Sequence, residues 1–242
     1  MTIDDVDVLG GRSERGPGRE DVLDNPVWHA LAGDHADVAE RVGRAARYRP
    51  DVSVFAGLDD LDDERAWADA ARLAGPGGSI VTAGVSAPPA GWQTRFSLPG
   101  VQMVATALES GPDPEAVRLG PADVPEMLDL VARTDPGPFR ERTIELGTYL
   151  GIRRDGALVA MAGERLSLPG WTEVSAVCTD PAHRGRGLAA RLVRAVAAGI
   201  EARGRTPILH AAAANANAIR LYEKLGFTLR RPIVFAAFEL SS

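Results

Sequence analysis

Apolar residues recur with two different periods in the second half of the chain. Residues 187–202 place Leu188, Leu192, Val196 and Ile200 on one face, which predicts a long amphipathic helix. Short runs rich in β-branched residues predict strands, and the Asp155-Gly156 pair between two of them predicts a hairpin. We expect strands at 117–119, 148–153, 158–165, 172–179, 207–212 and 233–240, and helices at 121–132, 139–146, 187–202 and 216–225. This alternation predicts a mixed α/β domain.

The first half has a looser α/β pattern. Residues 1–24 are polar and rich in glycine and charge, so we expect a disordered arm. Residues 25–110 predict a smaller α/β domain that has no catalytic motif. Its expected helices are 34–49 and 62–74, and its expected strands are 52–58, 79–83 and 101–108. Gly111-Pro112-Asp113-Pro114 is the clearest linker signal, so 115–242 is expected to form the second domain.

Composition narrows the classes of protein to consider. The chain has 242 residues, 45% of them hydrophobic, and no apolar run approaches the roughly 18 residues that cross a bilayer. Its single cysteine, Cys178, rules out an internal disulfide, and no Cys/His cluster has zinc spacing, so no metal is expected. The net charge of −6, without a basic stripe, argues against nucleic acid. We expect a cytoplasmic protein, because the N-terminus lacks the apolar region of a secretory signal. The chain is rich in alanine and arginine and has Lys224 as its only lysine, an amino-acid usage that suggests a GC-rich bacterial genome.

A glycine loop between a predicted strand and the long helix is the central feature. Residues 177–189 read Val-Cys-Thr-Asp-Pro-Ala-His-Arg-Gly-Arg-Gly-Leu-Ala. Glycines let backbone N–H groups approach a phosphate closely, and the helix N-terminus adds about half a positive charge. The Gly-Lys-Ser/Thr element of a Walker loop is missing, and the spacing differs from the dinucleotide fingerprint. Taken alone, Gly185 and Gly187 could equally serve only to turn a strand into a helix.

The loop resembles motif A of the GNAT superfamily of N-acetyltransferases. The family pattern Arg/Gln-x-x-Gly-x-Gly/Ala reads Arg184-x-x-Gly187-x-Ala189 here. The resemblance implies a GNAT fold, with a mixed central sheet flanked by helices, and acetyl-CoA as cosubstrate. It also implies that the strand before the loop contacts pantetheine and that the loop holds the pyrophosphate. The residues so implied are Val177, Cys178 and Thr179 for pantetheine, and Arg184, Gly185, Arg186, Gly187, Leu188 and Ala189 for the pyrophosphate.

A second segment makes the resemblance more specific. Residues 215–227 are similar to the family signature Asn-x-x-Ala-x-x-x-Tyr-x-x-x-Gly-Phe. Asn215 stands at a predicted helix start, where it can cap the helix, and the resemblance implies a contact with pantetheine. The resemblance also implies that Tyr222 protonates the departing thiolate of coenzyme A. Tyr222 could instead be a core aromatic beside Phe227, and Asn217 is an alternative to Asn215.

The general base is less well determined by the sequence. Glu173 is the first choice, because many relatives carry a carboxylate on this strand; a solvated or ion-paired strand residue is the equal alternative. Glu164 is the second choice, and His183 is expected to lie too far away. Cys178 has no His/Asp partner in the sequence pattern, so we expect a small packed residue beside the cofactor. The resemblance to GNAT enzymes implies direct transfer in a ternary complex.

The resemblance covers just over half of the chain, and its finer detail is similar to glycine-N-acyltransferase-like GNAT proteins with an N-terminal extension. It implies an acetyl or short acyl transfer to a small-molecule amine or a peptide N-terminus. A catalytically silent coenzyme A sensor or scaffold is the alternative. Residues 25–110 could be a degenerate GNAT-like half that shapes the acceptor site or a homodimer contact. The acceptor pocket is expected near residues 166–170 and Trp171.

Overall fold

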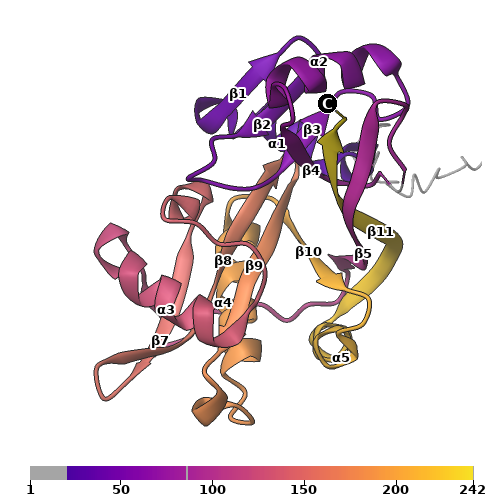
Figure 1. Cartoon of the computed structure of the whole chain (residues 1–242). Helices are drawn as coiled ribbons and strands as arrows, with labels where there is room; N and C mark the ends of the chain where they lie inside the picture. The colour runs from indigo at the N-terminus through magenta and orange to yellow at the C-terminus, as the bar shows by residue number, and fades with distance from the viewer. Residues whose placement is uncertain (1–20, 86, 242) are drawn as a thin grey trace, which may run out of the picture.

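The computed structural model describes residues 21–85 and 87–241. Its core is an eight-stranded mixed sheet in the order β4-β11-β5-β10-β9-β8-β7-β6 (Figure 1). The strands are β4 Ser79–Ala83, β5 Trp92–Ala105, β6 Val117–Arg118, β7 Tyr149–Arg154, β8 Ala157–Leu168, β9 Trp171–Thr179, β10 Thr206–Ala212 and β11 Phe227–Leu240. All neighbours are antiparallel except β9 and β10, which run parallel.

Two helices cover opposite faces of this sheet. The helix α3 Val124–Thr134 shares a buried cluster with Leu158 of β8. The helix α4 Leu188–Ala202 buries Leu192 and Val196 in a different cluster, with Val159 of the same strand. Because successive side chains of a strand point to opposite faces, Leu158 and Val159 place α3 and α4 on opposite sides. The mixed sheet with flanking helices confirms the predicted fold class.

A third helix, α5 Ala216–Leu225, packs on β11 and ends at the predicted glycine. Gly226 has φ 99°, the left-handed backbone that ends helices and favours glycine. The 3-10 helices η3 Pro121–Asp123 and η5 Pro181–His183 precede α3 and α4. The helices at 121–132, 187–202 and 216–225 and most of the predicted strands are confirmed to within a few residues. β5 and β11 begin nine and six residues before the strands predicted at 101–108 and 233–240, and only residues 56–58 of the strand predicted at 52–58 form one.

The predicted helix at 139–146 is wrong. Only the 3-10 turn η4 Thr143–Leu146 forms there. Thr143 donates its hydroxyl to the carbonyl of Val52 at 2.6 Å and accepts the amide N–H of Arg140 at 2.7 Å. A tertiary contact to a segment 91 residues away therefore holds this stretch in a turn.

The predicted helix at 34–49 is also wrong. The 3-10 helix η2 Ala36–Val38 is followed by the hairpin β1 Ala39–Val42 and β2 Ala45–Tyr48. Gly43 in the turn has φ 53°, and β2 pairs onward with β3 Ala56–Leu58 in a small three-stranded sheet. Gly43 provides the turn inside this stretch, and helical spacing is a weak signal that tertiary strand pairing outweighed.

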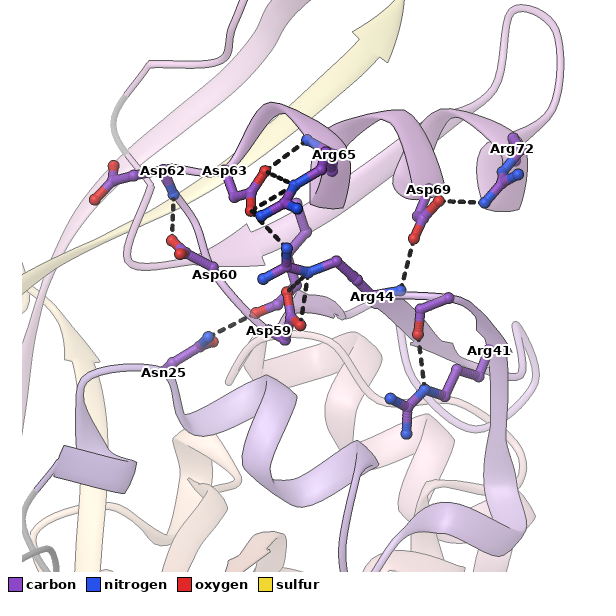
Figure 2. Close-up of polar contacts among 12 residues, drawn as sticks. Asn25, Arg41, Arg44, Asp59, Asp60, Asp62, Asp63, Arg65, Asp69 and Arg72 are labelled. Carbon is purple, nitrogen blue, oxygen red and sulfur yellow. Dashed lines mark hydrogen bonds and ion pairs between the residues drawn. The ribbon is translucent and has the colours of Figure 1, made fainter.

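The helix α2 Glu64–Ala74 confirms the helix predicted at 62–74. Arg44, in the hairpin, binds carboxylates at and near the start of this helix (Figure 2). The Arg44 guanidinium contacts Asp59 at 2.8 Å and Asp63 at 2.5 Å, while its backbone N–H donates to Asp69 at 2.7 Å. Asp63 also caps α2 by accepting the N–H of Arg65. This charged cluster thus joins the turn between β1 and β2, the end of β3 and the start of α2.

The predicted domain division at 111–114 stays a prediction, but the large sheet takes strands from both sides of it. β5, from the first half, lies between β10 and β11 of the second half. The small sheet, α1 Pro26–Leu31 and α2 sit at one end of the large sheet (Figure 1). Residues 1–20 of the predicted arm lie outside the described residues, whereas η1 Asp21–Leu23 buries Leu23. Within the described ranges, no helix is long and apolar enough to cross a membrane.

Candidate active site

The site begins where the two parallel strands separate. β10 pairs with β9 through Thr206–Ile208 and Trp171–Glu173, and β10 then follows β5 while β9 continues to Thr179. Ala176 has φ 51°, uncommon for a residue with a Cβ, and the pairing of β9 with β8 shifts register beside it. The bulge therefore interrupts the pairing of β9 with β8 where β9 has already separated from β10.

A groove of about 370 Å³ opens at this separation. It brings together the end of β9, the glycine loop, the start of α4 and one face of α5. Its lining includes nearly all the residues predicted to bind the cofactor: Val177, Cys178, Thr179, Arg184, Gly185, Gly187, Leu188, Ala189 and Asn215. Arg186 is exposed and does not line the groove. Their roles stay predictions, but the structure places them around one space.

The glycine loop leaves room for an anion. Gly185 and Gly187 have φ 76° and 73°, and a Cβ built on either would meet no atom within 4 Å. Gly187 caps the N-terminus of α4, whose first turn carries no acidic side chain. Free N–H groups of that turn, the helix dipole and the exposed Arg184 favour a phosphate group in this open space. These residues therefore fit the pyrophosphate of coenzyme A.

We expect Gly187→Ala to weaken coenzyme A binding about tenfold or more, because each lost charge-assisted hydrogen bond is worth about 1.5–3 kcal/mol. The added Cβ would occupy the anion space, and φ 73° would cost about 1–2 kcal/mol of backbone strain. Calorimetric titration with coenzyme A measures the affinity.

Gly204→Ala is the matched control for this strain. Gly204 has φ 72° and equally open surroundings, but it follows the opposite end of α4. This variant should lose similar stability and keep its affinity for coenzyme A. Equal affinity losses in both variants would contradict an anion site at Gly187.

Asn215 and Tyr222 reach the groove from α5. The Asn215 side-chain oxygen accepts the N–H of Ala218 at 3.1 Å, which confirms the predicted helix cap. Tyr222 is 8% exposed, and its ring lies 6.1 Å from that of Phe227. Burial raises the pKa of Tyr222 to about 12, so the phenol stays protonated at neutral pH and can act as an acid. Tyr222 is thus both a packing aromatic and a cavity-lining phenol.

A second cavity, of about 530 Å³, adjoins the groove. Both spaces are lined by Tyr222, Val177, Asn215 and Asp135, so they meet beside the phenol. The sequence predictions missed the residues that line only the second cavity. They include Phe55, Val81, Phe96, Leu98, Arg165, His210 and Phe235, whereas the predicted segment 166–170 is absent from the lining. Strand pairing over long sequence distances brings them together, and no local motif signals it.

Glu173 lies behind this cavity and does not line it. Its carboxylate is fully buried and accepts hydrogen bonds from Arg165 Nε at 2.8 Å, Arg165 Nη2 at 2.5 Å and His210 Nδ1 at 2.8 Å. Burial alone would raise its pKa, but Arg165 and His210 outweigh burial and lower the pKa to about 2. Glu164, the second candidate, is 4% exposed and pairs with Arg203 at 2.8 Å.

The proton positions on His210 follow from its neighbours. Arg230 donates to the Gln102 side-chain oxygen at 2.8 Å, so the Gln102 amide nitrogen faces the other way. That nitrogen lies 2.9 Å from the carbonyl of Leu23 and 3.0 Å from His210 Nε2. Gln102 therefore donates to Nε2, and we assign the ring proton to Nδ1, facing Glu173. In this arrangement Nδ1 donates to Glu173 and the Nε2 lone pair is occupied by Gln102.

The lowered pKa of Glu173 predicts a specific loss of stability in acid. Its stabilising contribution is complete above the ordinary pKa of 4.5 and disappears as the pH falls through the folded value of about 2. Urea unfolding between pH 6 and pH 2.5 should therefore show a steeper decline than in an Arg165→Met/Glu173→Gln double variant, which lacks this carboxylate. Parallel declines would contradict the pairing.

Comparison with known proteins identifies the family. The family model described as FR47-like protein matches residues 149–236. A crystal structure from Novosphingobium aromaticivorans, assigned to the GNAT family of acetyltransferases, is 43% identical. The match covers 91% of this chain and 99% of that one, with a TM-score of 0.83. The chain belongs to the GNAT family.

Other comparisons of this GNAT protein bear on the fold. A GCN5-related N-acetyltransferase from Kribbella flavida matches over 88% of this chain and 93% of its own, at 18% identity and a TM-score of 0.57. This likeness shows the shared fold. The curated proteins contain no match. These comparisons confirm the predicted family, and the protein is an N-acetyltransferase. Its membership of the glycine-N-acyltransferase-like subgroup stays a prediction. Among the described residues, no group of His, Cys, Asp or Glu could hold a metal ion.

Proposed function

We propose that this GNAT protein transfers an acetyl group from acetyl-CoA to an amine by direct attack within a ternary complex. One observation carries the proposal: a groove suited to the pyrophosphate and pantetheine meets a separate cavity at Tyr222. A donor in the groove and an acceptor in the cavity would place their reacting atoms beside the same phenol. Holding two reactants in this way is a large part of catalysis of a bimolecular step.

Tyr222 is proposed as the acid of the reaction. The neutral amine attacks the thioester carbonyl, so a carbon–nitrogen bond forms and the carbon–sulfur bond breaks. The departing thiolate takes the Tyr222 proton, and the amine loses its own proton. A buried phenol with a pKa of about 12 is fully protonated before the reaction, and a neutral donor suits a cavity of low polarity.

Glu173 as the direct base stays a prediction, and its geometry favours another role. With a pKa of about 2 and two partners, it is a weak proton acceptor at neutral pH. We propose that it holds Arg165 and His210 against the wall of the acceptor cavity, while water at the cavity mouth takes the amine proton. The first half then shapes the acceptor site, because Phe55, Phe96 and Leu98 line it.

The test is release of free coenzyme A from acetyl-CoA across a panel of amines, amino acids and peptides, together with thermal protection by acetyl-CoA. Protection plus amine-dependent release is the expected result. Protection without release from any acceptor would favour a coenzyme A sensor. Neither protection nor release would remove both functions.

A further inference from the structure

The acceptor cavity has a largely apolar wall. Phe55 and Phe235 lie with ring centroids 6.0 Å apart, and Val81 and Leu98 extend the same surface. Phe96 lines the cavity while remaining 49% exposed, so a ligand could cover much of its ring. Such a wall favours an acceptor with an aromatic or branched apolar body.

Two carboxylates, Asp135 and Glu173, and one guanidinium, Arg165, lie at the cavity. Arg165 lines the cavity, but its charge is balanced by the buried Glu173. His210 contacts the same buried carboxylate through Nδ1. Asp135 lines both the cavity and the groove; among the described residues, it has no ion-pair or hydrogen-bond partner for its side chain. One uncompensated carboxylate therefore remains, at the junction where the amine must attack.

Asp135 is also well placed by the backbone. It ends α3 with φ 47°, a left-handed conformation that aspartate and asparagine tolerate better than other residues with a Cβ. Its side chain is exposed at the cavity mouth, where water is available. A cationic amine can bind there, release a proton to water and then attack as the neutral amine.

The geometry points to a small primary amine as acceptor, cationic in solution, with an aromatic or branched apolar body and no carboxylate. This inference rests on the proposed function. A free amino acid would bring a carboxylate next to Asp135, where Arg165, already bound to Glu173, is the one cationic side chain in the lining. Asp135 is then a specificity-determining residue that binds the ammonium group.

The first experiment compares kcat/KM for 2-phenylethylamine, phenylalaninamide, phenylalanine and ethylamine at one pH, with saturating acetyl-CoA. The two aromatic cations should exceed phenylalanine at least about tenfold, because like charges disfavour its carboxylate. They should exceed ethylamine at least about tenfold, because ethylamine lacks the apolar body. Phenylalanine or ethylamine as an equal substrate would overturn the inference. A peptide with an N-terminal phenylalanine that outperformed every small amine would overturn the small-molecule assignment.

The second experiment uses Asp135→Asn, which keeps the backbone preference and removes the charge. We expect KM for 2-phenylethylamine to rise up to about fivefold, because an exposed ion pair contributes up to about 1 kcal/mol, with KM for acetyl-CoA unchanged. The difference from wild type should shrink with added salt, which a purely structural role would not cause. Asp129→Asn, at an exposed position of the same helix outside both cavities, is the matched control. An unchanged amine KM in Asp135→Asn would contradict the assignment.

Failure of the proposed function would look different. In that case no acceptor releases coenzyme A, and calorimetric titration of 2-phenylethylamine into the coenzyme A-saturated protein becomes decisive. Binding that weakens in Asp135→Asn would support the amine site without turnover. Absence of binding would overturn the inference as well.

Discussion

Replacing Tyr222 by phenylalanine is expected to lower kcat about 100-fold or more, the typical contribution of a positioned general acid. The phenol lies where groove and cavity meet, and burial holds its pKa at about 12, so wild type carries the proton throughout the neutral range. Phenylalanine keeps the ring packed against Phe227 and removes only the hydroxyl. Steady-state kinetics with the best acceptor, beside calorimetric binding of coenzyme A, separates turnover from affinity.

Tyr149→Phe provides the matched control for this variant. Tyr149 is also buried, but its hydroxyl has no hydrogen-bond partner among the residues that the structure describes, and its ring packs under α3, outside both cavities. Its loss should leave kcat unchanged. If Tyr222→Phe lowered affinity for coenzyme A as much as kcat, Tyr222 would be a binding residue and the acid would have to be sought elsewhere.

Glu173→Gln is expected to destabilise the protein by about 3–5 kcal/mol, because it leaves the buried Arg165 without its counter-charge. Arg165 has an 11% exposed side chain and donates two hydrogen bonds to Glu173, so glutamine removes the charge from a site with little access to water. Urea unfolding at pH 7 measures the loss. The destabilisation should be far larger than for Glu239→Gln, which breaks an exposed pair with Arg95.

The double variant Arg165→Met/Glu173→Gln separates charge imbalance from lost packing. Removing both charges should recover much of the stability lost by Glu173→Gln alone. Activity of the single variant, measured well below its unfolding temperature, tests the base role. A fall in kcat of about 100-fold without loss of stability would indicate that Glu173 takes the amine proton directly.

Local pattern predicted the second half of the chain well, and the physical reason is visible in particular elements. α4 has an apolar face of its own, and the glycine loop before it needs φ values near 75° that few residues besides glycine adopt. α5 carries its own cap at Asn215 and its own stop at Gly226. Where a segment contains its own helix cap, apolar face and terminating residue, tertiary contacts change its secondary structure little.

The two segments that were wrongly predicted to be helical lack such local signals. The stretch 34–49 becomes a hairpin because β2 pairs with β3 and Arg44 binds carboxylates of other elements. The stretch 139–146 stays a turn because Thr143 contacts Val52. In both cases contacts with residues distant in sequence stabilise the observed conformation more than a helix. No local sequence pattern indicates those contacts.

The same division holds for the site. The sequence alone determined the family, the phosphate-type loop and the candidate acid Tyr222, because those features sit in two contiguous segments with fixed spacing. Tertiary structure decided the acceptor side. Insertion of β5 between β10 and β11 brings Phe96 and Leu98 to a cavity shared with Phe55 and Phe235. Burial pairs Glu173 with Arg165, whereas Asp135 has no such partner within the described residues, because the pairing of charges in a folded protein depends on spatial neighbours.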